Sequence, residues 1–236
     1  MMSRVDVLPP RSSRAMPKSG KEGDPGASPE WGRVDLPAIE PQEKRIPAEP
    51  ALKHATIEAL LDDSGAADRS FKEHSLNVAA ISVRVGKALG LQERALELLR
   101  LAAVVHDVGK LTVPAEIIAK PGALDEAEWK LMRLHPAAGA ELLERCSPPA
   151  EILEIVRSHH ERWDGTGYPD GLAGEAIPLG ARILAVVDAY CAMVEERPYR
   201  EPRTPAAARE ELLAHAGSQF DSACAEVACR VTAAAA

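Results

Sequence analysis

The chain has 236 residues, of which 46% are apolar and 27% charged, enough apolar material for one sizeable core. Its 36 acidic and 28 basic residues leave a net charge of −8 at pH 7, so the molecule as a whole repels polyanions. Only 3 Trp, 3 Tyr and 2 Phe are present, too few for a surface that stacks several bases. The composition therefore argues against polymeric nucleic acid as a partner.

The cysteines and the apolar runs indicate a cytoplasmic protein. No two cysteines form a C-x-x-C pair, and the first residues do not resemble a secretory leader. The longest apolar stretches, such as Leu101–Val105, are far shorter than the roughly 20 residues that cross a bilayer. We therefore expect reduced thiols, a soluble chain and no membrane contact.

The amino-acid composition changes once along the chain. Residues 1–50 hold nine of the 19 prolines, mixed with Ser, Gly, Lys and Glu and without a sustained apolar period. Such a segment cannot bury a core and is typical of a disordered tail or linker. Over residues 51–236, Ala, Leu, Val and Glu recur at helical spacing and no alternating strand pattern appears. The sequence predicts an all-α domain over 51–236, preceded by a disordered Pro-rich tail over 1–50.

The first well-marked helix is expected over residues 93–108, where apolar residues recur three and four apart and Gly109 provides a stop. This helix would carry His106 and Asp107 in its last turn. Asp125 with Glu128 three residues later resembles a capping box, and predicts a helix that runs through Leu131.

Prolines mark the start of the next two helices. Pro136 stands at a first helical turn, which places His135 at a helix boundary. Pro148 and Pro149 open a helix with an inward apolar face, and His159 and His160 lie at its end. After a Gly- and Pro-rich stretch over 164–178, a helix over 179–195 carries Leu184, Asp188 and Cys191 on one face.

Five histidines and two aspartates occupy helix ends or inward helical faces: His74, His106, His135, His159, His160, Asp107 and Asp188. Buried ionisable groups are costly unless they are paired or ligated, and imidazole with carboxylate suits Mn, Fe, Co, Ni or Zn. Seven ligands exceed what one ion usually takes. Two ions roughly 3.5 to 4 Å apart that share Asp107 would use them all and would activate a water for hydrolysis. Each residue alone has an ordinary alternative, such as a hydrogen-bonded core histidine or a C-terminal helix cap.

These residues fall within a longer motif string that resembles the HD-GYP phosphodiesterases over roughly residues 71–220. The string reads H-D-V-G-K at 106–110, H-P at 135–136, H-H-E-R-W-D-G-T-G-Y-P-D-G-L at 159–172, R-I-L-A-V-V-D at 182–188 and R-P-Y-R at 197–200. The resemblance implies an HD-superfamily helical bundle with a structured GYP loop. It also implies hydrolysis of the bacterial messenger cyclic di-GMP to linear pGpG, to GMP or to both, at a two- or three-metal site that holds iron or manganese.

The resemblance assigns roles residue by residue. The same seven residues match the metal ligands of the family, with Asp107 as the bridge. Lys110 matches a lysine beside the scissile phosphate, so Asp107 and Lys110 are the catalytic candidates. Tyr168, Arg197 and Arg200 match positions that hold the bases and phosphates of the substrate, although surface ion pairs with nearby glutamates are the alternative for the two arginines.

Two positions depart from the family pattern. Some members carry a glutamate four residues before the first histidine as a ligand for a third ion, and here that position is Ser70. An aspartate usually follows the last metal-binding aspartate by three residues, and here that position is Cys191. Cys191 either packs as a small apolar group or alters metal affinity and redox sensitivity.

Three questions stay open at this point. A chain with this fold could instead bind a cyclic dinucleotide or a diguanylate cyclase and signal with little turnover. The substrate could be another cyclic or linear dinucleotide, because no residue identified here separates guanine from adenine. Whether the chain forms a homodimer is equally open.

Overall fold

The computed structural model describes residues 69–196 and 201–234, and within these ranges all regular structure is helical. The elements are α2 (Arg69–Ala88), α3 (Glu93–Val105), the 3₁₀ turn η1 (Val108–Thr112), α4 (Ala115–Ile118), α5 (Glu126–Met132), α6 (His135–Glu144), α7 (Ala150–Ser158), the 3₁₀ turn η2 (Gly174–Ala176), α8 (Leu179–Val194), α9 (Pro205–Ala214) and α10 (Ser222–Ala233). The all-α prediction is confirmed, whereas the expected tail over 1–50 lies outside the described residues. Within these ranges, none of the helices has the length and hydropathy of a membrane span.

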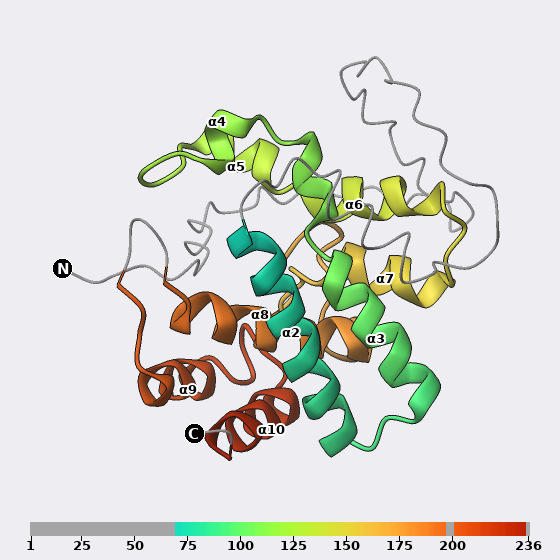
Figure 1. Cartoon of the computed structure of the whole chain (residues 1–236), viewed down its shortest axis with the longest axis vertical. Helices are drawn as coiled ribbons and strands as arrows, with labels where there is room; N and C mark the ends of the chain where they lie inside the picture. Colours follow the sequence, from blue (N-terminus) through green and yellow to red (C-terminus); the bar gives the residue numbers. More distant parts are fainter. Residues whose placement is uncertain (1–68, 197–200, 235–236) are drawn as a thin grey trace, which may run out of the picture. The chain divides into compact units, whose positions relative to one another are not determined.

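Helix α2 packs against α3, α8 and α10 (Figure 1). Helix α7 in turn contacts α3, α6 and α8. Side chains from these helices form the core, and Val78, Leu99, Ile152 and Leu184 are fully buried. Burial of each contributes about 1.5–3 kcal/mol relative to exposure. The helices that carry the candidate ligands therefore share one core.

A close backbone approach joins η1 to α6. A Cβ atom at Gly109 would lie 1.9 Å from the His135 carbonyl oxygen and 2.5 Å from the Gly139 nitrogen. Only glycine fits at this distance, because a side chain would have to displace backbone. The contact brings Asp107, the residue before η1, next to His135.

Several expected helix boundaries are confirmed. The capping box of Asp125 and Glu128 is present at the start of α5, Pro136 stands in the first turn of α6, and α8 spans Leu179–Val194. The expected end of the helix over 93–108 is wrong, because α3 ends at Val105 and the chain passes into η1. The approach of Gly109 to α6 requires this turn, and it places His106 and Asp107 between two elements rather than within one.

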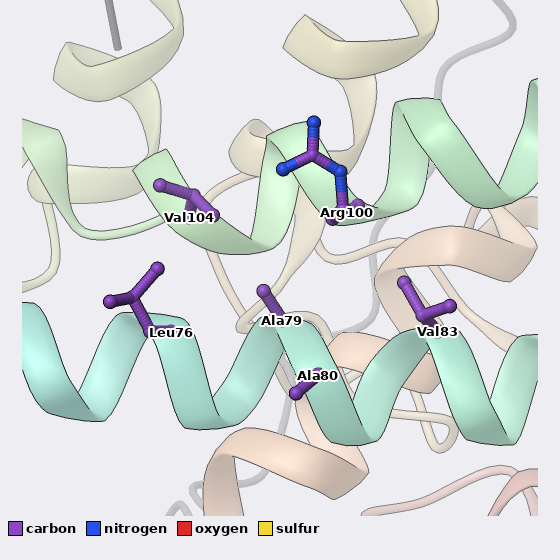
Figure 2. A pocket seen from close by; sticks show the side chains of 6 residues that line it. All are labelled: Leu76, Ala79, Ala80, Val83, Arg100 and Val104. Atoms are coloured by element: carbon purple, nitrogen blue, oxygen red, sulfur yellow. The ribbon is translucent and has the colours of Figure 1, made fainter. Parts of the chain in front are cut away.

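An open groove runs between α2 and α3 (Figure 2). It is lined by Leu76, Ala79, Ala80, Val83, Arg100 and Val104. Leu76 at its edge has 49% of its surface exposed. The groove shares no residue with the cluster of histidines described next.

Candidate metal centre

Helix ends orient three of the candidate ligands. His106 follows the last residue of α3, His135 comes three residues after the end of α5, and His159 follows the end of α7. Each ring donates its Nδ1 proton to the backbone carbonyl three residues earlier, at 2.8 Å (Ala103), 2.8 Å (Met132) and 2.6 Å (Val156). The last four carbonyls of a helix have no partner within it. Because a carbonyl only accepts, Nδ1 carries the proton, and in the neutral ring Nε2 then presents a lone pair.

These lone pairs meet in one buried space. Nε2 of His135 lies 3.3 Å from Nε2 of His159 and 3.3 Å from Oδ1 of Asp107. Two Nε2 atoms that both carry lone pairs cannot hydrogen bond to each other and repel at this distance. A cation between them would bind both lone pairs and remove the repulsion. Nε2 of His106 is also buried without a hydrogen-bond partner among the described residues. The donor set therefore fits a metal ion.

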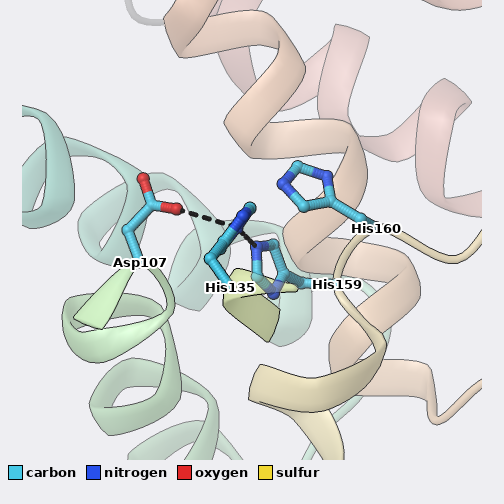
Figure 3. A group of neighbouring side chains, drawn as sticks. All are labelled: Asp107, His135, His159 and His160. Atoms are coloured by element: carbon cyan, nitrogen blue, oxygen red, sulfur yellow. Dashed lines mark hydrogen bonds and ion pairs between the residues drawn. The ribbon is translucent and has the colours of Figure 1, made fainter. Parts of the chain in front are cut away.

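The ionisable side chains form two groups that share Asp107. In each group, one ligand atom per residue lies within 4.8 Å of the others. The first group holds Asp107, His135, His159 and His160, and Figure 3 shows the His135 ring between Asp107 and His159. The second group holds Asp107, His74 and His106. The two oxygens of Asp107 divide between the groups, because Oδ1 faces His135 and Oδ2 lies 3.4 Å from Nε2 of His106.

Asp188 completes the second group. Its Oδ1 lies 3.1 Å from Nε2 of His74 and 3.8 Å from Nε2 of His106. The other six residues expected as ligands thus gather around Asp107. His74 lies on α2, His135 on α6 and Asp188 on α8, whereas His106 follows α3 and the pair His159 and His160 follows α7. The ligand roles themselves stay a prediction.

The charges of the first group suit cation binding. Burial raises the pKa of Asp107, but Lys110 and the neighbouring histidines outweigh it and hold that pKa well below its usual range. Burial, reinforced by the other imidazoles, lowers the pKa of His159 well below its ordinary value and lowers that of His160 to about 3. At neutral pH the aspartate is therefore ionised and these two imidazoles are neutral.

In the second group, His74 lies between two carboxylates. Its Nδ1 is 2.6 Å from Oε2 of Glu195 and its Nε2 is 3.1 Å from Oδ1 of Asp188. Burial lowers the pKa of His74, but the hydrogen bonds and charges of both carboxylates raise it to about 9. Burial raises the pKa of Asp188, while His74 and His106 lower it well below its usual range. A metal ion held at this position would take the place of the Nε2 proton of His74.

Lys110 and Tyr168 lie at the edge of the centre. Nζ of Lys110 donates to Oδ2 of Asp107 at 2.6 Å, and its side chain is 31% exposed. The Tyr168 ring lies 5.1 Å from the His160 ring at a 31° tilt. Both residues therefore face the metal centre on one side and solvent on the other.

A buried carboxylate anchors the loop that presents Tyr168. Oε1 of Glu161, a residue only 3% exposed, accepts hydrogen bonds from the backbone nitrogens of Asp170 at 2.7 Å and Gly171 at 3.0 Å. Arg157 on α7 pairs with Asp170 through two contacts of 2.7 Å. These bonds fix the loop to the end of α7, beside His159 and His160.

Arg197 and Arg200, the expected phosphate contacts, lie outside the described residues. Two residues near the site were missed by sequence reasoning. Glu195 contacts His74, and its spacing of seven residues from Asp188 was the available signal, because it continues the face of Asp188 and Cys191. Arg133 lies 5.8 Å from the centres of both the Trp129 and Tyr168 rings. No spacing signal links Arg133 to a loop 35 residues later.

A family model for the HD domain matches residues 56–224. The chain belongs to the HD domain family. This assignment confirms the family expected from the motif string.

Curated relatives of this HD-domain protein are named as phosphodiesterases. The chain is 42% identical over 165 residues to a cyclic di-GMP phosphodiesterase response regulator of Xanthomonas campestris pv. campestris, covering 68% of this chain and 42% of that protein. It is 38% identical over 167 residues to 3′3′-cGAMP-specific phosphodiesterase 2 of Vibrio cholerae, covering 70% and 31%. A cyclic di-GMP phosphodiesterase of Thermotoga maritima is 37% identical over 155 residues, with coverages of 65% and 42%. The chain thus spans less than half the length of these relatives.

Solved structures share the fold. A HDG"Y"P protein from Bdellovibrio bacteriovorus superposes with a TM-score of 0.59 at 19% identity, covering 76% of this chain and 57% of that chain. The HD domain of a Listeria monocytogenes phosphodiesterase, solved with cyclic-di-AMP, superposes with a TM-score of 0.53 at 19% identity, covering 75% and 94%. At these identities the likeness concerns the fold alone.

Proposed function

We propose that the chain is a metal-dependent phosphodiesterase that hydrolyses a cyclic dinucleotide, with cyclic di-GMP as its first candidate substrate and linear pGpG, GMP or both as products. The observation that carries the proposal is the position of Asp107, whose two oxygens face two groups of buried imidazoles. A carboxylate in this position can join two ions into one centre.

Two divalent ions held by the seven ligands would supply Lewis-acid chemistry, because they lower the pKa of water and neutralise charge on a phosphate. The protein side chains would hold the ions together and contact the phosphate. Asp107, kept ionised by its surroundings, holds the two halves of the centre together. Lys110 stands 2.6 Å from Asp107 and is partly exposed, so its ammonium can donate to a phosphate oxygen on which charge develops.

The proposed substrate is an anion with two purine bases, and the rim of the centre suits both features. Tyr168 presents a ring for a base beside His160, and Arg133 adds a cation over that ring. Arg197 and Arg200 are proposed to bind the phosphates, because a planar guanidinium matches phosphate geometry. Local cations of this kind let a chain with a net charge of −8 attract an anion.

Finer features belong to the same proposal. Iron or manganese is the proposed metal, because imidazole and carboxylate donors suit both. A cytoplasmic location is proposed from the messenger that the relatives are named for. Contact with a diguanylate cyclase and homodimerisation are kept as proposals that follow from the family resemblance alone.

The test is an assay of the full chain, purified without oxygen and loaded with Mn²⁺ or Fe²⁺. Cyclic di-GMP and 3′3′-cGAMP are supplied separately, and the products are separated by chromatography. We expect linear dinucleotide, mononucleotide or both from cyclic di-GMP, and loss of turnover by at least about 100-fold in Asp107→Ala. Glu226→Ala, which removes an exposed carboxylate on α10, is the matched control and keeps full activity.

Two results would overturn the proposal. The first is the absence of product from either cyclic dinucleotide when both metal sites are filled. The second is unchanged turnover in Asp107→Ala. A strong preference for 3′3′-cGAMP would keep the reaction and correct the substrate, in line with the relatives that carry that name.

A further inference from the structure

His74 is held differently from the histidines at helix ends. It lies inside α2, as the sixth residue of that helix. The carbonyl three residues before it is therefore engaged in the hydrogen-bond ladder of the helix and is not free to orient an imidazole. His74 consequently needs a partner from another element to fix which of its nitrogens faces the centre.

Glu195 supplies that partner from the end of α8. Its Oε2 lies 2.6 Å from Nδ1 of His74, at a position where the two side chains are only 25% and 10% exposed. Its second oxygen, Oε1, is buried without a hydrogen-bond donor among the described residues. Glu195 therefore directs its other oxygen, Oε2, at His74.

We propose that Glu195 is a positioning residue for metal binding: it accepts the Nδ1 proton of His74 and thereby directs the Nε2 lone pair to the ion between His74, His106, Asp107 and Asp188. A carboxylate on the remote nitrogen of a ligating histidine fixes the tautomer and increases the basicity of the ring. The inference rests on the proposed metal centre but does not depend on the substrate.

The first measurement is a Mn²⁺ titration of the metal-free full chain, with free ion followed by electron paramagnetic resonance. We expect two binding steps in the unmodified protein. In Glu195→Leu, the step that belongs to the His74 group weakens by about 10- to 100-fold, while the step at His135, His159 and His160 keeps its affinity. Glu196→Gln removes a neighbouring exposed carboxylate and leaves both steps unchanged.

The second measurement detects the proposed hydrogen bond. In Zn²⁺-loaded protein with ¹⁵N-labelled histidine, the Nδ1 proton of His74 gives a resonance protected from exchange with water. Glu195→Leu removes the resonance, because no acceptor remains. Glu195→Gln keeps an acceptor oxygen, so the resonance persists with a changed shift and part of the lost affinity returns. A purely structural role for Glu195 would not move this signal.

Two outcomes would overturn the inference. One is a Glu195→Leu protein that binds both ions as tightly as the unmodified chain. The other is a His74 resonance that is identical in Glu195→Gln and the unmodified chain, and this second result decides the matter even where Glu195→Leu does not fold. If no cyclic dinucleotide is hydrolysed but Glu195→Leu loses one ion, the proposed function fails and the positioning role stands.

Discussion

At the scale of single residues, the orientation of four of the five imidazoles follows from a local contact. Backbone carbonyls at helix ends hold the Nδ1 protons of His106, His135 and His159, and Glu195 holds that of His74. Each contact leaves Nε2 directed at Asp107 or Asp188. The ligand geometry is therefore set by the protein itself, which reduces the ordering that metal binding must impose.

A substitution at Gly109 tests whether the packing of η1 against the backbone of α6 positions Asp107 beside His135. A Cβ at this position would meet the His135 carbonyl oxygen at 1.9 Å. We expect Gly109→Ala to push η1 away from α6, to destabilise the protein by about 1–3 kcal/mol or more, and to lower the metal content. Urea unfolding and elemental analysis after dialysis measure the two effects.

Gly90 provides the matched control for that substitution. It has a φ of +87° with no atom near its missing Cβ, so Gly90→Ala costs about 1–2 kcal/mol through backbone strain alone. The metal content should not change. Equal metal content in Gly109→Ala and the unmodified chain would show that the approach of η1 to α6 does not position Asp107.

Cys191 is expected to be chemically inert in the folded protein. Burial raises the pKa of its thiol, and the charges of Glu195 and Asp188 raise it further. Cys191 is only 2% exposed, which favours the packing role over redox sensitivity. Iodoacetamide at pH 8.5 should label the partly exposed Cys146 at least about tenfold faster than Cys191, and should label both after unfolding. Equal labelling in the folded state would contradict this account.

The seven residues that the sequence predicts as ligands do lie together, whereas two of their neighbours were not predicted. Asp107, Asp188 and the five histidines could be recognised because each stands at a helix end or on an apolar face. Glu195 was missed because a charged residue near a helix end is usually solvated. Arg133 was missed because its aromatic neighbours come from separate segments, which only the folded chain brings together.

At the scale of elements, helix signals in the sequence predicted most of the boundaries. The capping box at Asp125 and the proline in the first turn of α6 act through local hydrogen bonds and backbone angles. The helix boundaries that they mark can therefore be predicted without the tertiary structure. The C-terminal boundary of α3 could not be predicted from local sequence. Its position depends on a tertiary contact between Gly109 and α6, which has no local signature.

Asp221 links two elements, and its loss should destabilise both. Its Oδ1 accepts from the Cys224 backbone nitrogen at 3.1 Å at the start of α10, and its Oδ2 pairs with Arg182 on α8 at 2.8 Å. We expect Asp221→Ala to lower the free energy of unfolding by about 1–2 kcal/mol at pH 7. Asp221→Asn keeps the cap and should lose less. Urea unfolding measures both, and an unchanged midpoint in Asp221→Ala would contradict the linking role.

The stabilisation that Asp221 contributes depends on pH. Burial raises the pKa of Asp221, but hydrogen bonds from the Cys224 nitrogen and Arg182 lower it below the ordinary value. A carboxyl with a depressed pKa in the folded state stabilises the protein above its unfolded pKa of about 3.9. This stabilisation is lost as the pH falls through the lower folded value. The difference between Asp221→Ala and the unmodified chain should therefore shrink below about pH 4.

At the scale of the whole molecule, bound metal should stabilise the fold. The Nε2 atoms of His135 and His159 lie 3.3 Å apart in a buried space, where a cation would be held by both. An ion at a free concentration 100 times its Kd adds about 2.7 kcal/mol per site, which raises the Tm of a domain of this size by about 5–10 °C. Calorimetry with and without a chelator measures the shift. Asp107→Ala should lose it, and an equal Tm in both conditions would count against a metal centre.

The most direct test of the account is the position of the ions themselves. Crystals grown with Mn²⁺ and measured by anomalous diffraction should show two peaks roughly 3.5–4 Å apart, both ligated by Asp107. One peak should lie among His135, His159 and His160, and the other among His74, His106 and Asp188. A single peak, or two peaks that do not share Asp107, would contradict the central claim.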